Sequence, residues 1–356
     1  MTVSDDSNNE NVRDFDSSLN DLRRKEMSRR KLILSGLASS LLPFLPFESA
    51  LAGESTPDTI PRRLLGSTGE KVSIVGVGGY HIGVPTESEG IKIVQTALDS
   101  GVNFLDNCWD YNGGVSEERM GKALRGHYRA KAFLMSKIDG RDYKSATKQI
   151  DESLKRLQTD HLDLMQIHEV IRTTDPDACF AENSTVQALI DAKKAGKVRF
   201  IGFTGHKSPD IHLSMLETAR KHNFRFDAVQ MPLNVMDAHY DSFEKKVLPI
   251  LVKEKIGVLG MKSLGSGILL QSGAVTAPEC LRYAMSLPTS VVITGCDSME
   301  ILEQALKVAR EFRPYSSSER LALLNKTEKF ASNGKFERYK TTTNFDGTVQ
   351  HPEWLG

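Results

Sequence analysis

The chain has 356 residues, of which 39% are hydrophobic, so it can bury a large core as one α/β barrel or as two ordinary domains. Its 46 basic and 46 acidic residues give a formal net charge of zero, which excludes the positive excess typical of nucleic-acid-binding proteins. The four cysteines are widely spaced and form no Cys-x-x-Cys pair, so we expect neither a zinc knuckle nor a disulfide framework. A small neutral partner is the default expectation.

The first 52 residues have the pattern of a leader followed by an export signal. Residues 1–26 are polar and lack apolar periodicity, which predicts disorder. Residues 27–52 combine a basic start, an apolar segment and an Ala-x-Ala site, and the paired Arg29 and Arg30 resemble a twin-arginine signal. We therefore expect export by the Tat machinery to the periplasm or cell exterior, and a cytoplasmic protein if the signal is not used. The apolar segment is short and contains prolines, so no stable membrane span is expected in the mature form, with a membrane anchor as the alternative and Met27 as an alternative start.

A regular alternation of short apolar runs and amphipathic runs follows the linker at residues 53–61. A Gly-Ser-Thr-Gly turn between apolar residues predicts a β-hairpin over residues 62–73. The later apolar runs predict strands at 74–79, 103–108, 132–138, 162–168, 198–203, 227–231, 256–261 and 290–295. Amphipathic patterns between them predict helices, among them those at 117–126, 184–195, 211–222, 243–254 and 278–287.

Eight strands that are each followed by a helix are the number needed for a (β/α)8 TIM barrel, which we place at residues 62–315. A doubly wound open sheet is the alternative. It is disfavoured because the first strand-to-helix turn lacks the Gly-x-Gly-x-x-Gly fingerprint of the dinucleotide-binding version. Residues 316–356 are predicted to form a C-terminal helix and a tail that pack on the barrel.

Four chemically active residues stand at or just beyond the ends of three successive predicted strands: Asp106 and Tyr111, then Lys137, then His168. Parallel strands present their carboxyl ends at one end of a barrel, where active sites lie. A tyrosine has a pKa near 10, so Lys137, held by Asp106, is predicted to lower the pKa of Tyr111. His168 is predicted to position the substrate oxygen. The set suits protonation of a carbonyl oxygen as hydride arrives at its carbon, or the reverse reaction.

The four residues, with their flanking Asn-Phe-Leu-Asp, Met-Ser-Lys and Gln-Ile-His segments, resemble the catalytic tetrad of the aldo-keto reductase family. The likeness extends from about Arg62 to Phe312. It implies an oxidoreductase that acts on a small-molecule carbonyl or alcohol substrate with NADP(H) or NAD(H), as a monomer or small homo-oligomer. The cofactor-binding residues implied by the resemblance are Asp106, Thr204, Gln230, Leu264, Gly265, Gly267, Gly295 and Ser298.

Some positions differ from the common pattern of that family. Thr204-Gly205-His206 replaces a frequent Ser-Asn pair, Met261 replaces an aromatic residue, and Ile301 replaces an arginine that binds the 2′-phosphate of NADPH. The choice between NADP(H) and NAD(H) therefore stays open. The neighbouring Lys262 is a candidate phosphate contact, with a solvated lysine as the alternative.

We expect His81, Trp109 and Glu169 to shape the substrate pocket, because they stand near the ends of predicted strands. Two other functions remain open: a sensor or partner subunit that binds the cofactor without turnover, and a metal-dependent hydrolase built on His81, His168 and His206. The chain has no His-x-His or His-Glu-x-x-His pair, so no metal site is expected. Because free NADPH outside the cell would be scarce, an exported enzyme is expected to hold its nicotinamide tightly.

Overall fold

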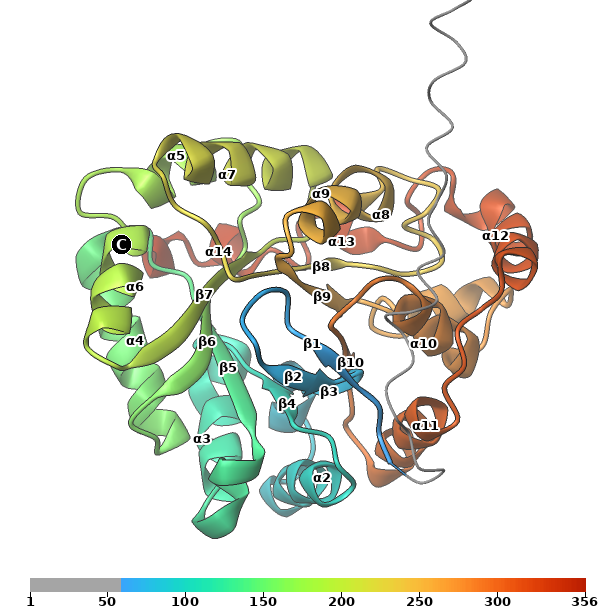
Figure 1. Ribbon diagram of the computed structural model, residues 1–356, viewed down its shortest axis with the longest axis horizontal. Coiled ribbons are helices and arrows are strands. Elements are labelled where there is room, and N and C mark those ends of the chain that lie inside the picture. Colours follow the sequence, from blue (N-terminus) through green and yellow to red (C-terminus); the bar gives the residue numbers. More distant parts are fainter. Residues whose placement is uncertain (1–58) are drawn as a thin grey trace, which may run out of the picture. The chain divides into compact units, whose positions relative to one another are not determined.

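The computed structural model describes residues 59–356, so the predicted leader and signal lie outside the described residues, as does most of the linker. Eight parallel strands close into a barrel in the order β10-β3-β4-β5-β6-β7-β8-β9 (Figure 1). Their bounds are β3 (Val75–Gly78), β4 (Phe104–Asp106), β5 (Phe133–Ile138), β6 (Leu162–Ile167), β7 (Val198–Thr204), β8 (Ala228–Pro232), β9 (Gly257–Met261) and β10 (Val291–Gly295). The seam of the barrel is the pairing of β10 with β3, in which Val292 faces Val75. The predicted (β/α)8 barrel is confirmed, and the open-sheet alternative is wrong.

Helices follow the strands and surround the barrel (Figure 1). Their bounds are α2 (Glu87–Asp99), α3 (Val115–Ala123), α4 (Tyr143–Leu157), α5 (Asp175–Phe180), α6 (Thr185–Lys194), α7 (Pro209–Lys221), α8 (Phe243–Lys246), α9 (Leu248–Lys253), α10 (Ala277–Ser286) and α11 (Met299–Arg310). The single helix predicted at 243–254 is instead divided into α8 and α9. Pro249 explains the division, because proline has no backbone N–H to continue a helix and fits the first turn of a new one.

The barrel interior is filled by alternate residues of the strands, since successive side chains of a strand point to opposite faces. Phe104 and Phe133 stack there with ring centroids 5.3 Å apart. The predicted hairpin is present as β1 (Arg62–Leu64) paired antiparallel with β2 (Lys71–Ser73). Leu65 and Val72 of the hairpin are fully buried in the same cluster, where each contributes about 1.5–3 kcal/mol of hydrophobic stabilisation. The hairpin therefore closes one end of the barrel.

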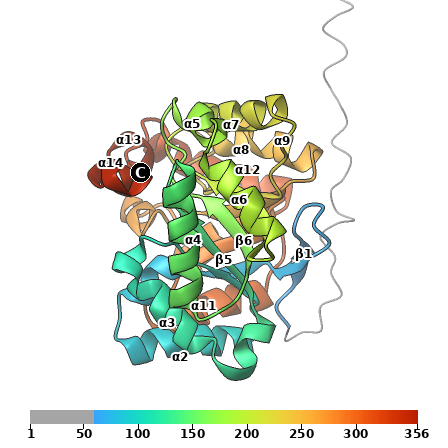
Figure 2. The ribbon, with the colours of Figure 1, turned by 90° about the vertical axis from the view of Figure 1, so that its left-hand side faces the viewer.

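The C-terminal segment lies at the opposite end, as Figure 2 shows for α13, α14 and the chain terminus relative to β1. It comprises α12 (Ser317–Ala331), α13 (Arg338–Thr341), α14 (Gly347–Gln350) and the 3-10 turn η6 (Pro352–Leu355). We call residues 337–356 the C-terminal strap. The strap is held by Lys340, whose Nζ lies 2.6 Å from Asp237 Oδ1 and 3.0 Å from Glu337 Oε1, with all three side chains buried. Across the part of the chain that the structure describes, no helix has the length and apolar character needed to cross a membrane.

Candidate active site

Lys137 is the centre of the candidate site. Its Nζ forms an ion pair with Asp106 Oδ1, donates to the backbone oxygen of Asn107 at 2.7 Å, and donates to Tyr111 Oη at 3.2 Å. The three donors of the ammonium are thus all used, which compensates for its burial at 1% exposure. Asp106 ends β4 and Lys137 lies in β5, while Tyr111 begins the 3-10 turn after β4. The structure therefore brings these three predicted residues together.

The pKa of Tyr111 differs from the prediction. Burial raises it well above the ordinary value for tyrosine, and the charge of Asp106 raises it further. The predicted net lowering of this pKa is wrong for this state of the protein, because burial and the charge of Asp106 outweigh any stabilisation of the phenolate by Lys137. The phenol of Tyr111 therefore keeps its proton, which is the state that a proton donor requires.

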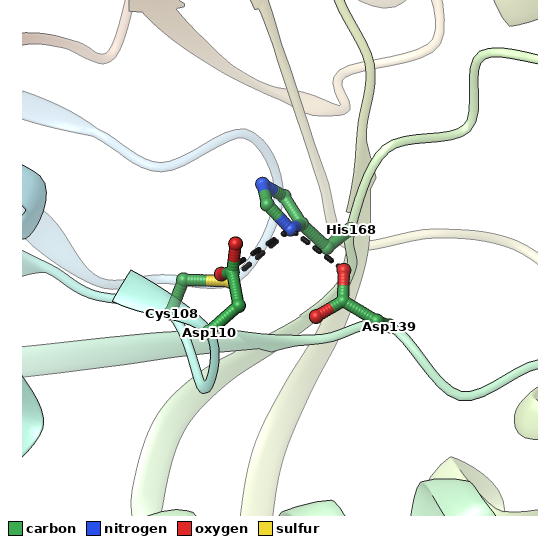
Figure 3. Close-up of side chains that lie close together, drawn as sticks. All are labelled: Cys108, Asp110, Asp139 and His168. Atoms are coloured by element: carbon green, nitrogen blue, oxygen red, sulfur yellow. Dashed lines mark hydrogen bonds and ion pairs between the residues drawn. The ribbon is translucent and has the colours of Figure 1, made fainter. Parts of the chain in front are cut away.

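His168 follows β6 and lies beside Tyr111, with the two ring centroids 5.8 Å apart. Its Nδ1 lies 2.9 Å from Asp139 Oδ1, 3.2 Å from Cys108 Sγ and 3.6 Å from Asp110 Oδ1. Figure 3 shows that the other ring nitrogen points away from these three groups. A carboxylate at Nδ1 fixes the ring orientation and favours a proton on that nitrogen. Nε2 is consequently left for the substrate.

The charge of His168 is set by the carboxylates around it. Burial alone would lower its pKa, but the negative charges of Asp110 and Asp139 outweigh burial and raise it. The pKa of the Asp110 carboxyl is also raised, to about 6, because burial and the charge of Asp139 outweigh the opposing effect of His168. The histidine is thus held closer to its protonated form than a free imidazole would be.

Asp139, Asp110 and Cys108 surround His168 but were not predicted from the sequence to have a role. Two of them carry a usable signal, because Cys108 is two residues after Asp106 and Asp139 is two residues after Lys137, the spacing of side chains on one face of a strand. Asp110 has no such signal, because it lies in the turn before Tyr111, and its approach to His168 depends on the fold.

The three histidines proposed for a metal site do not act together. His206 Nε2 is paired with Asp346 Oδ1 of the strap at 2.8 Å, and His81 packs so closely on Gly295 that any side chain there would overlap its ring. Among the described residues, a different set, Cys108, Asp110, Asp139 and His168, places metal-binding atom types within 4.8 Å of one another. All three other residues of this set lie around His168 Nδ1, and Asp139 is its short hydrogen-bond partner, so hydrogen bonding to one histidine accounts for the grouping.

Polar atoms without partners lie beside the tetrad, on β6, β7 and β8. Within the described chain, Gln166 Oε1 and Nε2, Thr204 Oγ1 and Gln230 Oε1 are buried and have no hydrogen-bond partner. Thr204 is paired in register with Gln230, and Gln166 faces Gly202, where a side chain would overlap the backbone oxygen of Ala228. A carboxamide offers two donors and one acceptor, so these residues fit the nicotinamide that the resemblance implies. Gln166 was missed, although it lies two residues before His168.

The remaining cofactor candidates lie on β9, β10 and the segments that follow them. Gly265, Ser266 and Gly267 all have positive φ (57°, 58° and 81°), so the predicted phosphate loop is a tight left-handed turn. Ser298 caps α11, since its hydroxyl accepts from the backbone N–H of Ile301. Ile301 itself is 41% exposed and supplies no positive charge for a 2′-phosphate.

The predicted pocket residues Trp109 and Glu169 both contact the C-terminal strap. The Glu169 carboxylate accepts from Gly347 N at 2.8 Å and from Thr348 N and Oγ1, both at 2.7 Å. Trp109 lies edge-on to Trp354 with centroids 5.9 Å apart. The strap therefore forms part of the mouth of the barrel, and Glu169 anchors it.

Comparisons with known proteins place this geometry in context. Residues 74–279 match the model of the Aldo/keto reductase family. An L-galactose dehydrogenase of Arabidopsis thaliana is 33% identical over 60% of this chain and 68% of its own length, and an aldo-keto reductase of Bacillus subtilis is 28% identical over 58% and 62%. The chain thus spans about two thirds of the length of these curated relatives. The holo form of an aldo-keto reductase from Bacillus halodurans has a similar fold, with a TM-score of 0.64 at 21% identity over 75% of this chain and 96% of that one.

Proposed function

Because the chain belongs to the aldo/keto reductase family and is an oxidoreductase, we propose that it interconverts a carbonyl and an alcohol with Tyr111 as the general acid and base. The observation that carries the proposal is the hydrogen-bonded series Asp106, Lys137 and Tyr111, with His168 beside it at the mouth of the barrel. A bound NAD(P)H would supply the hydride. Proton transfer, stabilisation of the phenolate and positioning of the substrate oxygen are assigned to side chains of this protein.

In the reducing direction, Tyr111 Oη gives its proton to the carbonyl oxygen as the carbonyl carbon receives the hydride. The phenolate that results is stabilised by the ammonium of Lys137, 3.2 Å away, and the ion pair with Asp106 orients that ammonium. His168 directs Nε2–H at the same oxygen. In the oxidising direction the phenolate takes the proton back from the alcohol.

The nicotinamide is assigned to the unpartnered polar atoms of Gln166, Thr204 and Gln230, with Asp106 near its ribose. The loop at Leu264, Gly265 and Gly267 is assigned to the pyrophosphate, and the adenosine end to Gly295 and Ser298. The lack of a cation at Ile301 weighs against a dedicated 2′-phosphate site. Titration with NADH and NADPH, followed by tyrosine and tryptophan fluorescence, tests which one binds.

Replacement of Tyr111 by phenylalanine tests the mechanism. We expect Tyr111→Phe to bind the cofactor like the wild type but to lose about 10²- to 10⁴-fold in turnover, the usual contribution of a positioned acid or base. Tyr128→Phe is the matched control, because Tyr128 is a partly exposed tyrosine outside the candidate site whose hydroxyl donates to Asp99. Ordinary turnover in Tyr111→Phe would contradict the proposal. Sugars with an aldehyde or hemiacetal belong in the first substrate screen, given the similarity to L-galactose dehydrogenase.

We further propose that the protein is exported by the twin-arginine signal and carries a tightly held nicotinamide acquired in the cytoplasm. The support is the order of residues at the N-terminus, Arg29 and Arg30 followed by an apolar segment. Cell fractionation tests the location. Acid release from the purified exported protein tests the cofactor, and an empty site with weak affinity would contradict this proposal.

A further inference from the structure

Lys262 is a positively charged residue at the mouth of the barrel that the proposed mechanism does not use. It directly follows β9, and its φ of 56° is in the left-handed region that residues with a side chain rarely adopt. Its Nζ lies over the rings of Phe345 and Tyr339 of the strap, 4.7 Å and 5.6 Å from their centroids. Backbone strain of this kind tends to persist at functional sites.

The charges that act on Lys262 place it within the candidate active site. They are the ammonium of Lys137 and the carboxylates of Glu169 and Asp346, and Lys262 acts in turn on His81 and His206. Burial, with the added repulsion from Lys137, lowers the pKa of Lys262 to about 8 although the two carboxylates oppose the change. At neutral pH the side chain is therefore mostly charged.

Neither nearby carboxylate is available as a partner. Glu169 accepts three hydrogen bonds from Gly347 and Thr348. Asp346 pairs with His206 Nε2 at 2.8 Å and with Lys207 Nζ at 2.7 Å. Within residues 59–356, Lys262 Nζ has ring faces for neighbours and no hydrogen bond or ion pair. An ammonium that is partly removed from water is costly unless a negative group or hydrogen-bond acceptors replace the lost hydration.

We propose that Lys262 binds an anionic oxygen group of the bound small molecule, which is either a phosphate of the dinucleotide or a carboxylate of the substrate. The inference rests on the proposed function in that it assumes a ligand at this mouth. Both sources are compatible with its position, since Lys262 lies two residues before Leu264, where the predicted phosphate loop begins, and also lies within electrostatic range of Lys137. The two aromatic rings of the strap shield the contact from water and so strengthen it.

The test compares Lys262→Met, Lys262→Arg and the wild type in two arms. The first arm measures the Kd of NADH by fluorescence, which needs no turnover. The second arm measures KM for a matched pair of aldehydes, 4-oxobutanoate and its methyl ester, which differ in the carboxylate. Lys148→Met is the control, because Lys148 is an exposed lysine of α4 that pairs only with Glu152.

A phosphate contact predicts that Lys262→Met weakens NADH binding about 10- to 100-fold, the effect of losing one charge-assisted hydrogen bond, and that Lys262→Arg restores most of it. A carboxylate contact predicts instead that Lys262→Met has the same KM for 4-oxobutanoate as for its methyl ester, while its Kd for NADH is unchanged. Unchanged values in both arms would overturn the inference. Loss of NADH affinity in Lys262→Met, together with a wild type that reduces no carbonyl, would refute the proposed function and leave the inference standing. A wild type that binds no nicotinamide and reduces neither aldehyde would overturn both.

Discussion

The substitution Asp139→Asn weakens the hydrogen bond between Asp139 and His168 without changing the size or shape of the side chain. Asp139 Oδ1 lies 2.9 Å from His168 Nδ1, and Asp139 is fully buried. Asparagine keeps an oxygen acceptor at the same place but removes the negative charge. His168 then loses one of the carboxylates that raise its pKa, with Asp110 and Glu169 remaining, so its protonated form becomes less stable.

The size of the effect follows from the change in bond type. A hydrogen bond to a charged group contributes about 1.5–3 kcal/mol and a neutral one about 0.5–1.5 kcal/mol, so the substitution costs about 1–1.5 kcal/mol. If His168 donates to the substrate oxygen in the transition state, that cost becomes a loss of about 5- to 10-fold in kcat/KM. The pKa of His168 falls, so the loss of kcat/KM at high pH begins at a lower pH than in the wild type.

The assay is kcat/KM as a function of pH, with cofactor affinity measured separately. Asp163→Asn is the matched control, because Asp163 is likewise a buried carboxylate. It accepts from Leu134 N, Arg129 and Arg199, and it lies near the start of β6, away from the mouth. We expect Asp163→Asn to lower stability and leave the pH profile in place. An Asp139→Asn enzyme with the rate and pH profile of the wild type would refute the assignment of His168 as a charged donor held by Asp139.

Two further predictions concern stability. Lys340→Met leaves the buried carboxylates of Asp237 and Glu337 without their cation, so we expect the free energy of unfolding, measured in urea, to fall by about 3–5 kcal/mol. The control Lys326→Met removes an exposed pair with Glu279 and should change the free energy of unfolding little. An unchanged urea midpoint for Lys340→Met would count against the role of Lys340 in anchoring the strap. The pKa of Asp110 is raised from 3.8 to about 6, chiefly by burial, so its contribution to stability is complete below about pH 4 and is lost as pH rises through 6. Asp110→Asn should therefore gain stability relative to the wild type by about 2–3 kcal/mol between pH 4 and 7, and a difference that does not vary with pH would refute this.

The strands could be predicted from the sequence because each is a short apolar run between polar segments. The run predicted at 162–168 is β6, Leu162–Ile167, and each of the other seven strands overlaps its predicted run, although β4 is shorter, at Phe104–Asp106. Parallel strands buried on both faces need such runs, so the pattern is strong. The division between α8 and α9 was missed because a helical period spans it and only Pro249 marks the break.

The sequence predicts those parts of the candidate site that are recognisable from residue type and position alone. Asp106, Tyr111, Lys137 and His168 stand out by residue type at strand ends, and the structure brings them together. The direction in which the pKa of Tyr111 shifts could not be predicted from residue types, because it depends on how completely the phenol is buried.

The role of the strap was also beyond the sequence. Glu169 and His206 bind Thr348 and Asp346, which lie well over a hundred residues later in the chain, and no local pattern connects them. Contacts at this separation are set by the closed barrel, which brings the end of the chain back across the mouth.

The seam between β10 and β3 has a consequence for how the protein folds. Val292 meets Val75 only after the six intervening strands are made, so the backbone groups of β3 that face the seam have no strand partner in a partial chain that lacks β10. Pairings between residues so distant in sequence close slowly, because the chain loses its loop entropy before the contact forms. A ribosome-bound intermediate that lacks β10 therefore presents two open strand edges, on β3 and β9, and such edges favour aggregation until β10 pairs with both.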